Sequence, residues 1–434
     1  MIVLFLSMIV LLLAGVPVAF AIAIPSLAWV LLFMPPEAWP VAAQKIVNGS
    51  ENFILLAVPL FMLTGELMNR GGVTQRLVRF AEALVGGIHG GLAQVVVIVN
   101  MIMAGVSGAA IADAAAVGSI MIPAMKEKGY RPGFAAAVNA AAATIGPVIP
   151  PSVGFLIYAS VVVVSPGQPS VTPEKLFLAG AVPGLLMGLY MLVVCYVLAR
   201  HWKLPRGARV PLGRLAREAL GAVWALLMPV ILLGGILSGV MTPTEAGAVA
   251  VLYGLLAGFF IYRELKPRDL IPILSKVARQ SAAIMLVIAC ANLFGWIMAY
   301  NNVAESLMQG FTGLTASPHV FLIIISAIAI LLGCFMEGGS IMIILTPLLC
   351  PVLEEYGVDL VQFGVIFQLT IMIGLLTPPV GMLLFVITGV SGVPMQNTLK
   401  NLWPFFVVLL LLLAMLIFIP DISLWLPRLR YGAG

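Results

Sequence analysis

Long apolar runs separated by short polar connections dominate the chain. An α-helix needs about 20 mostly apolar residues to cross a bilayer. Runs of comparable length lie at residues 2–33, 52–69, 88–106, 176–199, 221–240, 243–262, 281–300, 318–334 and 402–420. Three further apolar stretches, 107–126, 132–164 and 335–390, are interrupted by glycines and prolines. The pattern predicts an all-α protein that crosses a membrane many times.

The first apolar run, residues 2–33, has an interruption from Gly15 to Pro17. No basic region precedes it, and it is longer than the ~7–15 apolar residues of a signal peptide. We therefore expect a retained transmembrane segment.

The composition supports a polytopic membrane protein. Charged residues make up 9% of the 434 residues and apolar residues 62%, whereas a soluble domain has about 25% charged residues. So few charges could not cover the surface of a soluble fold of this size. Soluble, disordered and disulfide-scaffold proteins are excluded, and the lipid bilayer is the expected surrounding.

The basic residues lie mainly in short connections, so the net charge of +5 does not predict a nucleic-acid partner. The linker 200–217 has one basic cluster and no acidic residue: Arg200, Lys203, Arg206, Arg209, Arg214 and Arg217. The positive-inside rule places this linker in the cytoplasm. The connection 165–175 carries one acid and one base and is predicted to face the other side.

Two amphipathic basic segments, 70–87 and 263–280, are predicted to lie along the membrane interface. The side chains expected near lipid headgroups are Arg76, Arg79, Lys276 and Arg279.

An internal repeat emerges when the chain is shifted by 228 residues. The coinciding pairs are Gly105 with Gly333, Pro123 with Pro351, Glu127 with Glu355, Gly129 with Gly357, Ile145 with Ile373, Gly146 with Gly374, Pro150 with Pro378 and Pro151 with Pro379. Helix-breaking residues coincide at both ends of this block, which favours a duplication. We divide the chain into a first repeat (1–199), the linker (200–217), a second repeat (218–420) and a tail (421–434).

The connection after the shared proline differs in charge between the copies. It carries Lys126, Lys128 and Arg131 in the first copy and Glu354, Glu355 and Asp359 in the second. Opposite charge in equivalent loops predicts opposite sides of the membrane, and hence an inverted-topology repeat. One observation opposes inversion: 70–87 and 263–280 are both basic, and placing both in the cytoplasm requires a further crossing.

Each repeat contains a glycine-rich polar patch in an apolar context, at 104–113 and at 333–340. Irregular backbone at membrane depth is tolerated only where it is buried or lines a cavity. We therefore predict re-entrant hairpins at about 105–128 and 333–356. Close helix packing through small residues is the alternative.

A helix break follows each predicted hairpin, within 132–164 and within 360–390. The breaks contain Pro150 and Pro151 in the first copy, and Pro378 and Pro379 in the second. Consecutive prolines remove backbone donors and leave carbonyls unpaired, at a cost of several kcal/mol each in lipid. A desolvated Na+ can satisfy such carbonyls, whereas a simple proline kink is the structural alternative.

Four carboxylates lie at membrane depth. Asp113 and Glu337 fall near the predicted hairpin tips, so we expect them to handle an ion, a proton or substrate; capping or packing is the alternative. Glu66 and Glu245 lie near helix ends, where capping is the expected role.

No enzyme motif is present: there is no HExxH, no P-loop and no G-x-S-x-G. The four cysteines are scattered and lack a C-x-x-C pair, so we expect small buried side chains rather than disulfides or metal ligands. We expect no cofactor and no metal other than Na+. Uphill transport would need an ion gradient or a partner ATPase.

The chain resembles the large membrane subunit of TRAP (tripartite ATP-independent periplasmic) transporters over nearly its whole length. The segments that carry the resemblance are PLFMLTGELMNRGGVTQRL near Pro59, GVSGAAIADAAAVGSIMIPAMKEKGY at Gly105, ATIGPVIPPS at Ala143, MTPTEAGAVAVLYGL at Met241, LTPLLCPVLEEYGVDLVQFGVI from Leu345 and MIGLLTPPVGMLLFV at Met372.

This resemblance implies a multi-pass transporter of the bacterial inner membrane that imports organic acids (C4-dicarboxylate, sialic acid or another carboxylate) with a Na+ gradient. It implies an elevator mechanism, in which the hairpins and broken helices slide against a scaffold. It also implies two partners, a small four-helix membrane subunit and a periplasmic substrate-binding protein.

The resemblance further implies two Na+ positions and a substrate position. The first Na+ position comprises Ser107, Gly108, Ala109, Gly146, Pro147 and Ile149. The second comprises Glu337, Gly338, Gly339, Ser340, Gly374 and Thr377. Substrate would lie between the hairpin tips, near Asp113 and Ser152. The second tip has a carboxylate and two glycines where the family pattern has small hydroxylated residues, which leaves H+ coupling open.

Two other functions fit parts of the pattern. A stand-alone dicarboxylate or citrate symporter of similar hairpin architecture would need no partner. A membrane scaffold or intramembrane enzyme would use the repeat only for packing, and would show no uptake.

Overall fold

The computed structural model describes residues 1–51, 53–207, 210–303, 305 and 315–432. Arg209 of the basic linker and the first residue of the predicted span 52–69 lie outside these ranges. The described residues form helices and connections, with no strand. Seven of their helices are long and apolar enough to cross a membrane. The prediction of an all-α polytopic protein is confirmed.

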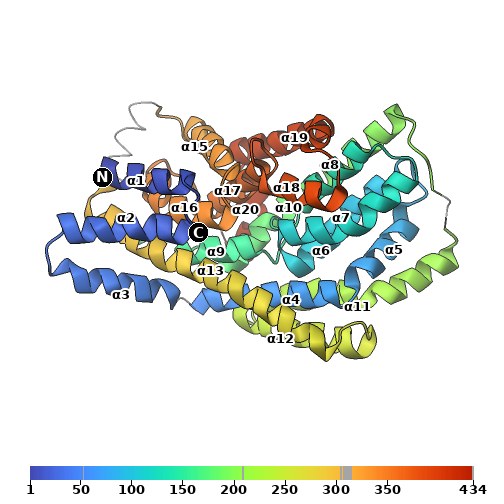
Figure 1. The fold of residues 1–434 in the computed structure, drawn as a ribbon, viewed down its shortest axis with the longest axis horizontal. Coiled ribbons are helices and arrows are strands. Elements are labelled where there is room, and N and C mark those ends of the chain that lie inside the picture. The colour runs from blue at the N-terminus through green and yellow to red at the C-terminus, as the bar shows by residue number, and fades with distance from the viewer. Residues whose placement is uncertain (52, 208–209, 304, 306–314, 433–434) are drawn as a thin grey trace.

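The first half of the chain runs through the helices labelled α1 to α10 in Figure 1. Their bounds are α1 (Ile2–Leu13), α2 (Val18–Phe33), α3 (Ala38–Ser50), the 3-10 helix η1 (Phe53–Leu56), α4 (Ala57–Arg70), α5 (Val73–Val85), α6 (Gly91–Ser107), α7 (Ala110–Glu127), α8 (Pro132–Ala143), α9 (Val153–Val161) and α10 (Pro173–His201).

The second half begins with α11 after the linker. Its elements are α11 (Leu212–Leu237), α12 (Pro243–Leu256), the π-helix η2 (Ala257–Ile261), α13 (Pro267–Tyr300), α15 (Pro318–Gly333), α16 (Gly338–Glu355), α17 (Leu360–Leu375), α18 (Met382–Ser391), α19 (Met395–Phe418) and α20 (Asp421–Tyr431). The candidate spans are η1 with α4, α10, α11, α12 with η2, α13, α16 and α19.

Helix bounds recur at the spacing found in the sequence. Helices α7 and α16 begin and end 228 residues apart, and α8 and α17 begin 228 residues apart. Each of these pairs is followed by a non-helical stretch that contains the duplicated Pro-Pro. The sequence offset therefore corresponds to a repeated order of helices.

The apolar run 2–33 is not one helix. The chain turns at Gly15, whose φ of +80° suits glycine, and Pro17 precedes the first residue of α2. Helices α1 and α2 then pack against each other. The prediction of one interrupted segment is corrected to two short helices, because Gly15 reverses the chain instead of kinking it.

The segment 70–87 forms α5, as predicted for an amphipathic helix, and buries Val73, Leu77 and Ala81. The segment 263–280 does not form a separate interfacial helix. Its residues from Pro267 onward are the first turns of α13, which continues to Tyr300. With 34 residues, α13 is about 51 Å long at 1.5 Å per residue, so it extends beyond a bilayer core of about 30 Å.

The two basic segments are neighbours. An ion pair of 2.7 Å joins Arg76 to Glu264, and one of 3.4 Å joins Arg70 to Asp269. An even number of spans lies between the segments (the broken helix α8–α9, then α10, α11 and α12). Both segments can therefore face one side of the membrane without an added crossing.

One pair of contacts crosses between the two halves at equivalent positions. The Lys126 ammonium, at the end of α7, donates to the carbonyl oxygen of Ser391 at 2.7 Å. At the position 228 residues later, the Glu354 carboxylate accepts from the backbone N–H of Ser165 at 3.0 Å and from its hydroxyl. The outer arm of each hairpin thus bonds to the end of the broken helix of the other half.

Candidate ion and substrate site

The first hairpin turns at Gly108 and Ala109, between α6 and α7. Gly108 has a φ of +57°, and a Cβ there would lie 2.9 Å from the carbonyl oxygen of Pro151. Only glycine therefore fits both the backbone conformation and the close approach. The tip consequently contacts the first helix break, between α8 and α9.

The second hairpin turns between α15 and α16. Here the backbone N–H of Gly381 donates to the carbonyl oxygen of Cys334 at 3.1 Å. A Cβ on Gly333 would lie 2.9 Å from the Cα of Gly374. The second tip therefore contacts the second helix break, which separates α17 from α18.

Asp113 lies behind the first tip and is fully buried. Its Oδ1 accepts a 2.5 Å hydrogen bond from the Ser107 hydroxyl. Its Oδ2 has no hydrogen-bond partner among the described residues, and it faces Gly146 so closely that a Cβ there would lie 2.7 Å away. A buried, unpartnered carboxylate oxygen is costly, so this position offers a cation an oxygen ligand.

Ser152 has a different local role from the one predicted. Its hydroxyl donates to the carbonyl oxygen of Pro147 at 2.5 Å and accepts from the backbone N–H of Phe155 at 3.3 Å. It thereby caps the N-terminus of α9. The hydroxyl holds the first break together and lies away from the cavity described below.

The residues predicted for the second ion position gather around the second break. Glu337 precedes the first residue of α16, and Ser340 is buried one turn later. The Thr377 hydroxyl donates to the carbonyl oxygen of Ile373 at 2.8 Å, which leaves its oxygen lone pairs available. This group contains the oxygen donors that a hard cation binds.

A cavity of about 320 Å³ lies between the two tips, which is within the usual size range of small-molecule sites. The first tip contributes Ser107, Gly108, Ala109 and Pro147; the second contributes Glu337, Gly338 and Gly339. Asp113 and Ser152, predicted near substrate, do not line it. The predicted Gly146, Ile149, Ser340, Gly374 and Thr377, and the four break prolines, also lie outside its lining.

Sequence reasoning missed the charged wall of this cavity. Glu66 of α4 and Lys276 of α13 form an ion pair of 2.7 Å, and both line the cavity. Lys276 was predicted near lipid headgroups and Glu66 as a helix cap; both predictions are wrong, because α13 runs alongside α4 and brings the two side chains together. The available signal was Glu66 itself, since a carboxylate at membrane depth is functional by default.

Gln368 of α17 is a further missed residue of the cavity wall. A Cβ on Gly154 would lie 2.2 Å from the Gln368 Oε1, so the glycine makes room for this amide. Gln368 and Gln280 add hydrogen-bonding groups to a mostly apolar wall.

The other predictions on polar residues have plain outcomes. Glu245 completes a capping box with Thr242, as predicted. All four cysteines are free and buried, also as predicted.

Comparison with known proteins follows from this geometry. Residues 5–422 match the family model for the tripartite ATP-independent periplasmic transporter, DctM component. The chain belongs to this TRAP transporter family. It is 40% identical over 401 residues to the C4-dicarboxylate TRAP transporter large permease protein DctM of Pseudomonas aeruginosa, with 92% of each chain covered.

A second TRAP relative has a different substrate in its name. The chain is 38% identical to the sialic acid TRAP transporter large permease protein SiaM of Vibrio cholerae, covering 98% of this chain and 97% of the relative. These relatives are permeases, and TRAP permeases are inner-membrane proteins. The present chain is accordingly a multi-pass TRAP large permease of the inner membrane.

The fold is shared with a solved transporter. The crystal structure of the Alcanivorax borkumensis YdaH transporter, described as having an unusual topology, matches with a TM-score of 0.63 and 13% identity, covering 92% of this chain and 90% of the other. This likeness concerns the fold alone.

Proposed function

We propose that this TRAP permease imports an organic acid and couples its movement to Na+. The single observation that carries the proposal is the unpartnered Oδ2 of Asp113, buried at the first helix break beside a cavity bounded by both hairpin tips. The TRAP relatives named for C4-dicarboxylate and sialic acid make a carboxylate the substrate class.

The charges of the cavity wall favour cation coupling. Lys276 contributes one positive charge, and Glu66 and Glu337 contribute two negative charges. An organic anion would therefore enter a cavity whose ionised side chains already sum to a negative charge. Cations bound at the two breaks would offset this repulsion, so binding of Na+ and binding of the acid would favour each other.

We assign the first Na+ position to Ser107, Asp113 and the backbone around Gly146. This assignment moves Asp113 from the substrate to the ion, since it lies behind the tip and not in the cavity wall. The second position comprises Glu337, Ser340, Thr377 and the backbone near Gly374. Glu337 in place of a hydroxylated residue makes H+ the alternative coupling ion at this second position.

We further propose an inverted arrangement of the two hairpins. The start of α6 lies beside the basic linker, because His89 forms an isolated bridge with Arg206. The end of α16 instead contacts Ser165. Helix α10 connects the 165–175 side to the linker side with 29 residues, about 43 Å at 1.5 Å per residue, so these contacts support opposite membrane sides for the two hairpin bases.

Cysteine labelling tests the inversion. Glu127→Cys and Glu355→Cys place thiols at equivalent exposed positions, whereas the native cysteines are buried. In intact cells, a membrane-impermeant maleimide is expected to label the Glu355 variant and to spare the Glu127 variant until the cells are opened. Labelling of both thiols from the same side would exclude the inverted arrangement.

An elevator movement and two partners complete the proposal. Both tips and both breaks contact each other directly, which supports their moving as one unit against α4 and α13. A small four-helix membrane subunit and a periplasmic binding protein are proposed because the family is tripartite.

Uptake by proteoliposomes tests the function. The chain, reconstituted with its small subunit and its binding protein, is expected to accumulate radiolabelled succinate or N-acetylneuraminate when Na+ is higher outside. A K+ gradient is the control and is expected to give only background uptake. Uptake that is equally fast without the binding protein would favour a stand-alone symporter, and no Na+-driven uptake of either acid would contradict the proposal.

A further inference from the structure

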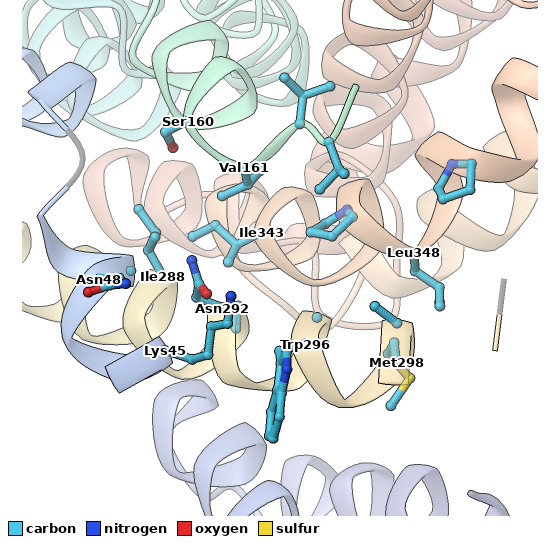
Figure 2. Close-up of a pocket in the computed structure, with 18 residues that line it drawn as sticks. Lys45, Asn48, Ser160, Val161, Ile288, Asn292, Trp296, Met298, Ile343 and Leu348 are labelled. Atoms are coloured by element: carbon cyan, nitrogen blue, oxygen red, sulfur yellow. The ribbon is translucent and has the colours of Figure 1, made fainter. Parts of the chain in front are cut away.

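A second cavity of about 460 Å³ lies beyond the tip cavity, between α3, α13, α16 and the end of α9. It shares no lining residue with the tip cavity. Figure 2 shows its labelled polar side chains: Lys45 and Asn48 from α3, Asn292 from α13 and Ser160 from α9. The remaining wall is largely apolar and includes Trp296 and Ile343.

Close packing of α3 on α13 creates the polar side of this cavity. A Cβ on Gly49 would lie 2.8 Å from the Asn292 Cβ and 2.9 Å from the Ala289 Cα. Gly49 therefore lets the two helices approach closely, and this brings Lys45 and Asn48 beside Asn292. In Figure 2 the Lys45 side chain extends toward Asn292.

Lys45 is a positive charge without a counterion in this part of the molecule. The ion pairs and hydrogen bonds among the described residues include none to Lys45. An ammonium group offers three donors and no acceptor, and each asparagine amide offers two donors. A largely apolar cavity with one unpaired ammonium and two amides is suited to a carboxylate.

The two cavities follow one another along the same helices. Helices α9, α13 and α16 line both. On α13, Lys276 lines the tip cavity and Asn292 the second one, which corresponds to about 24 Å of helix rise. On α9, Ile157 lines the tip cavity and Ser160 to Val163 line the second. A solute leaving one cavity along these helices would reach the other.

We propose that this second cavity is an outer binding site for the carboxylate of the transported acid, with Lys45, Asn48 and Asn292 as its ligands. The inference rests on the proposed function, which supplies an organic acid as solute. Val163 leads directly into the connection 165–175, the segment predicted to face away from the cytoplasm. The acid therefore meets Lys45 first and Lys276 afterwards.

Thiol chemistry at Ala299 tests the charge of the site independently of transport. Ala299 is exposed and lines the cavity. In Ala299→Cys, the anionic reagent MTSES is expected to react faster than the cationic MTSET. Adding Lys45→Gln is expected to lower this rate ratio by about tenfold, because a positive charge nearby attracts anions, whereas Lys45→Arg preserves it. Gln168→Cys, in the exposed connection, is the control whose ratio Lys45→Gln leaves unchanged.

Protection and uptake complete the test. Succinate or N-acetylneuraminate, whichever the wild-type protein transports, is expected to slow MTSES labelling of the introduced thiol. Lys45→Gln is expected to raise the KM for that acid several-fold, with Lys128→Gln, on an exposed loop, as control.

Three results would overturn the outer site: a reagent ratio that ignores Lys45, no protection by a transported acid, or protection by phosphatidylglycerol in the vesicle and by neither acid. Absence of uptake with the labelling preference intact would instead contradict the proposed function alone, so the two failures are distinguishable.

Discussion

Asp113→Asn is expected to abolish the stabilisation of this permease by Na+. In the wild-type protein, a ligand that binds only the folded state at 100 times its Kd adds about 2.7 kcal/mol. A Na+-specific rise in Tm over choline chloride at equal ionic strength is therefore expected. Asparagine keeps an acceptor for the Ser107 hydroxyl but removes the carboxylate charge and directs an amide toward Gly146, so the rise disappears.

The same variant separates ion binding from misfolding. In choline chloride, Asp113→Asn is expected to melt at or above the wild-type temperature, because it removes a buried carboxylate oxygen that lacks a partner. Na+-driven uptake is expected to fall by about a hundredfold, which corresponds to roughly 2.7 kcal/mol. Asp359→Asn, at the N-cap of α17, is the matched control, since asparagine caps about as well as aspartate. A wild-type Na+ response in Asp113→Asn would remove this residue from the ion site.

Lys276→Gln is expected to raise the KM for the transported acid by tenfold or more. Among the described residues that line the tip cavity, Lys276 is the only cation. Glutamine removes its charge and leaves Glu66 facing the cavity unpaired, which further repels an anion. A tenfold change corresponds to about 1.4 kcal/mol, and initial uptake rates over a substrate series measure it.

Two companion variants interpret this result. Arg279→Gln changes a basic residue three positions along α13 whose side chain bonds Ser275 of its own helix, and its KM is expected to stay at the wild-type value. Glu66→Gln with Lys276→Gln removes both charges and is expected to recover part of the lost affinity. If the single Lys276 variant kept the wild-type KM, the substrate carboxylate would have to bind elsewhere.

Local signals along the chain predicted the features that have local causes. Apolar runs gave most of the spans, and the duplicated glycines and prolines marked the helix breaks, because a proline without an N–H ends a helix wherever it lies. The offset of 228 residues predicted helices that begin and end at matching positions. These features depend on neighbours within a few residues.

Features set by long-range packing could not be predicted this way. The pairing of Glu66 with Lys276 depends on α4 lying beside α13, and no spacing in the sequence indicates that neighbour. The polar start of α13 was interpreted as a separate interfacial helix because a long helix can extend beyond the bilayer with polar residues. The burial of Asp113 behind the first tip, instead of in the cavity wall, also depends on how the tip packs against the break.

The crossed contacts at Lys126 and Glu354 give the charge reversal between the two halves a second meaning. Helix α18 ends in the carbonyl of Ser391, an acceptor that only a donor such as an ammonium can satisfy. The chain after α9 presents the N–H and hydroxyl of Ser165, donors that call for a carboxylate. The two positions perform one task, fastening a hairpin to the opposite half, with opposite chemistry. The pseudo-symmetry of this permease is thus preserved in bonding partners where residue identity has been lost, and side chains of opposite sign can be true equivalents.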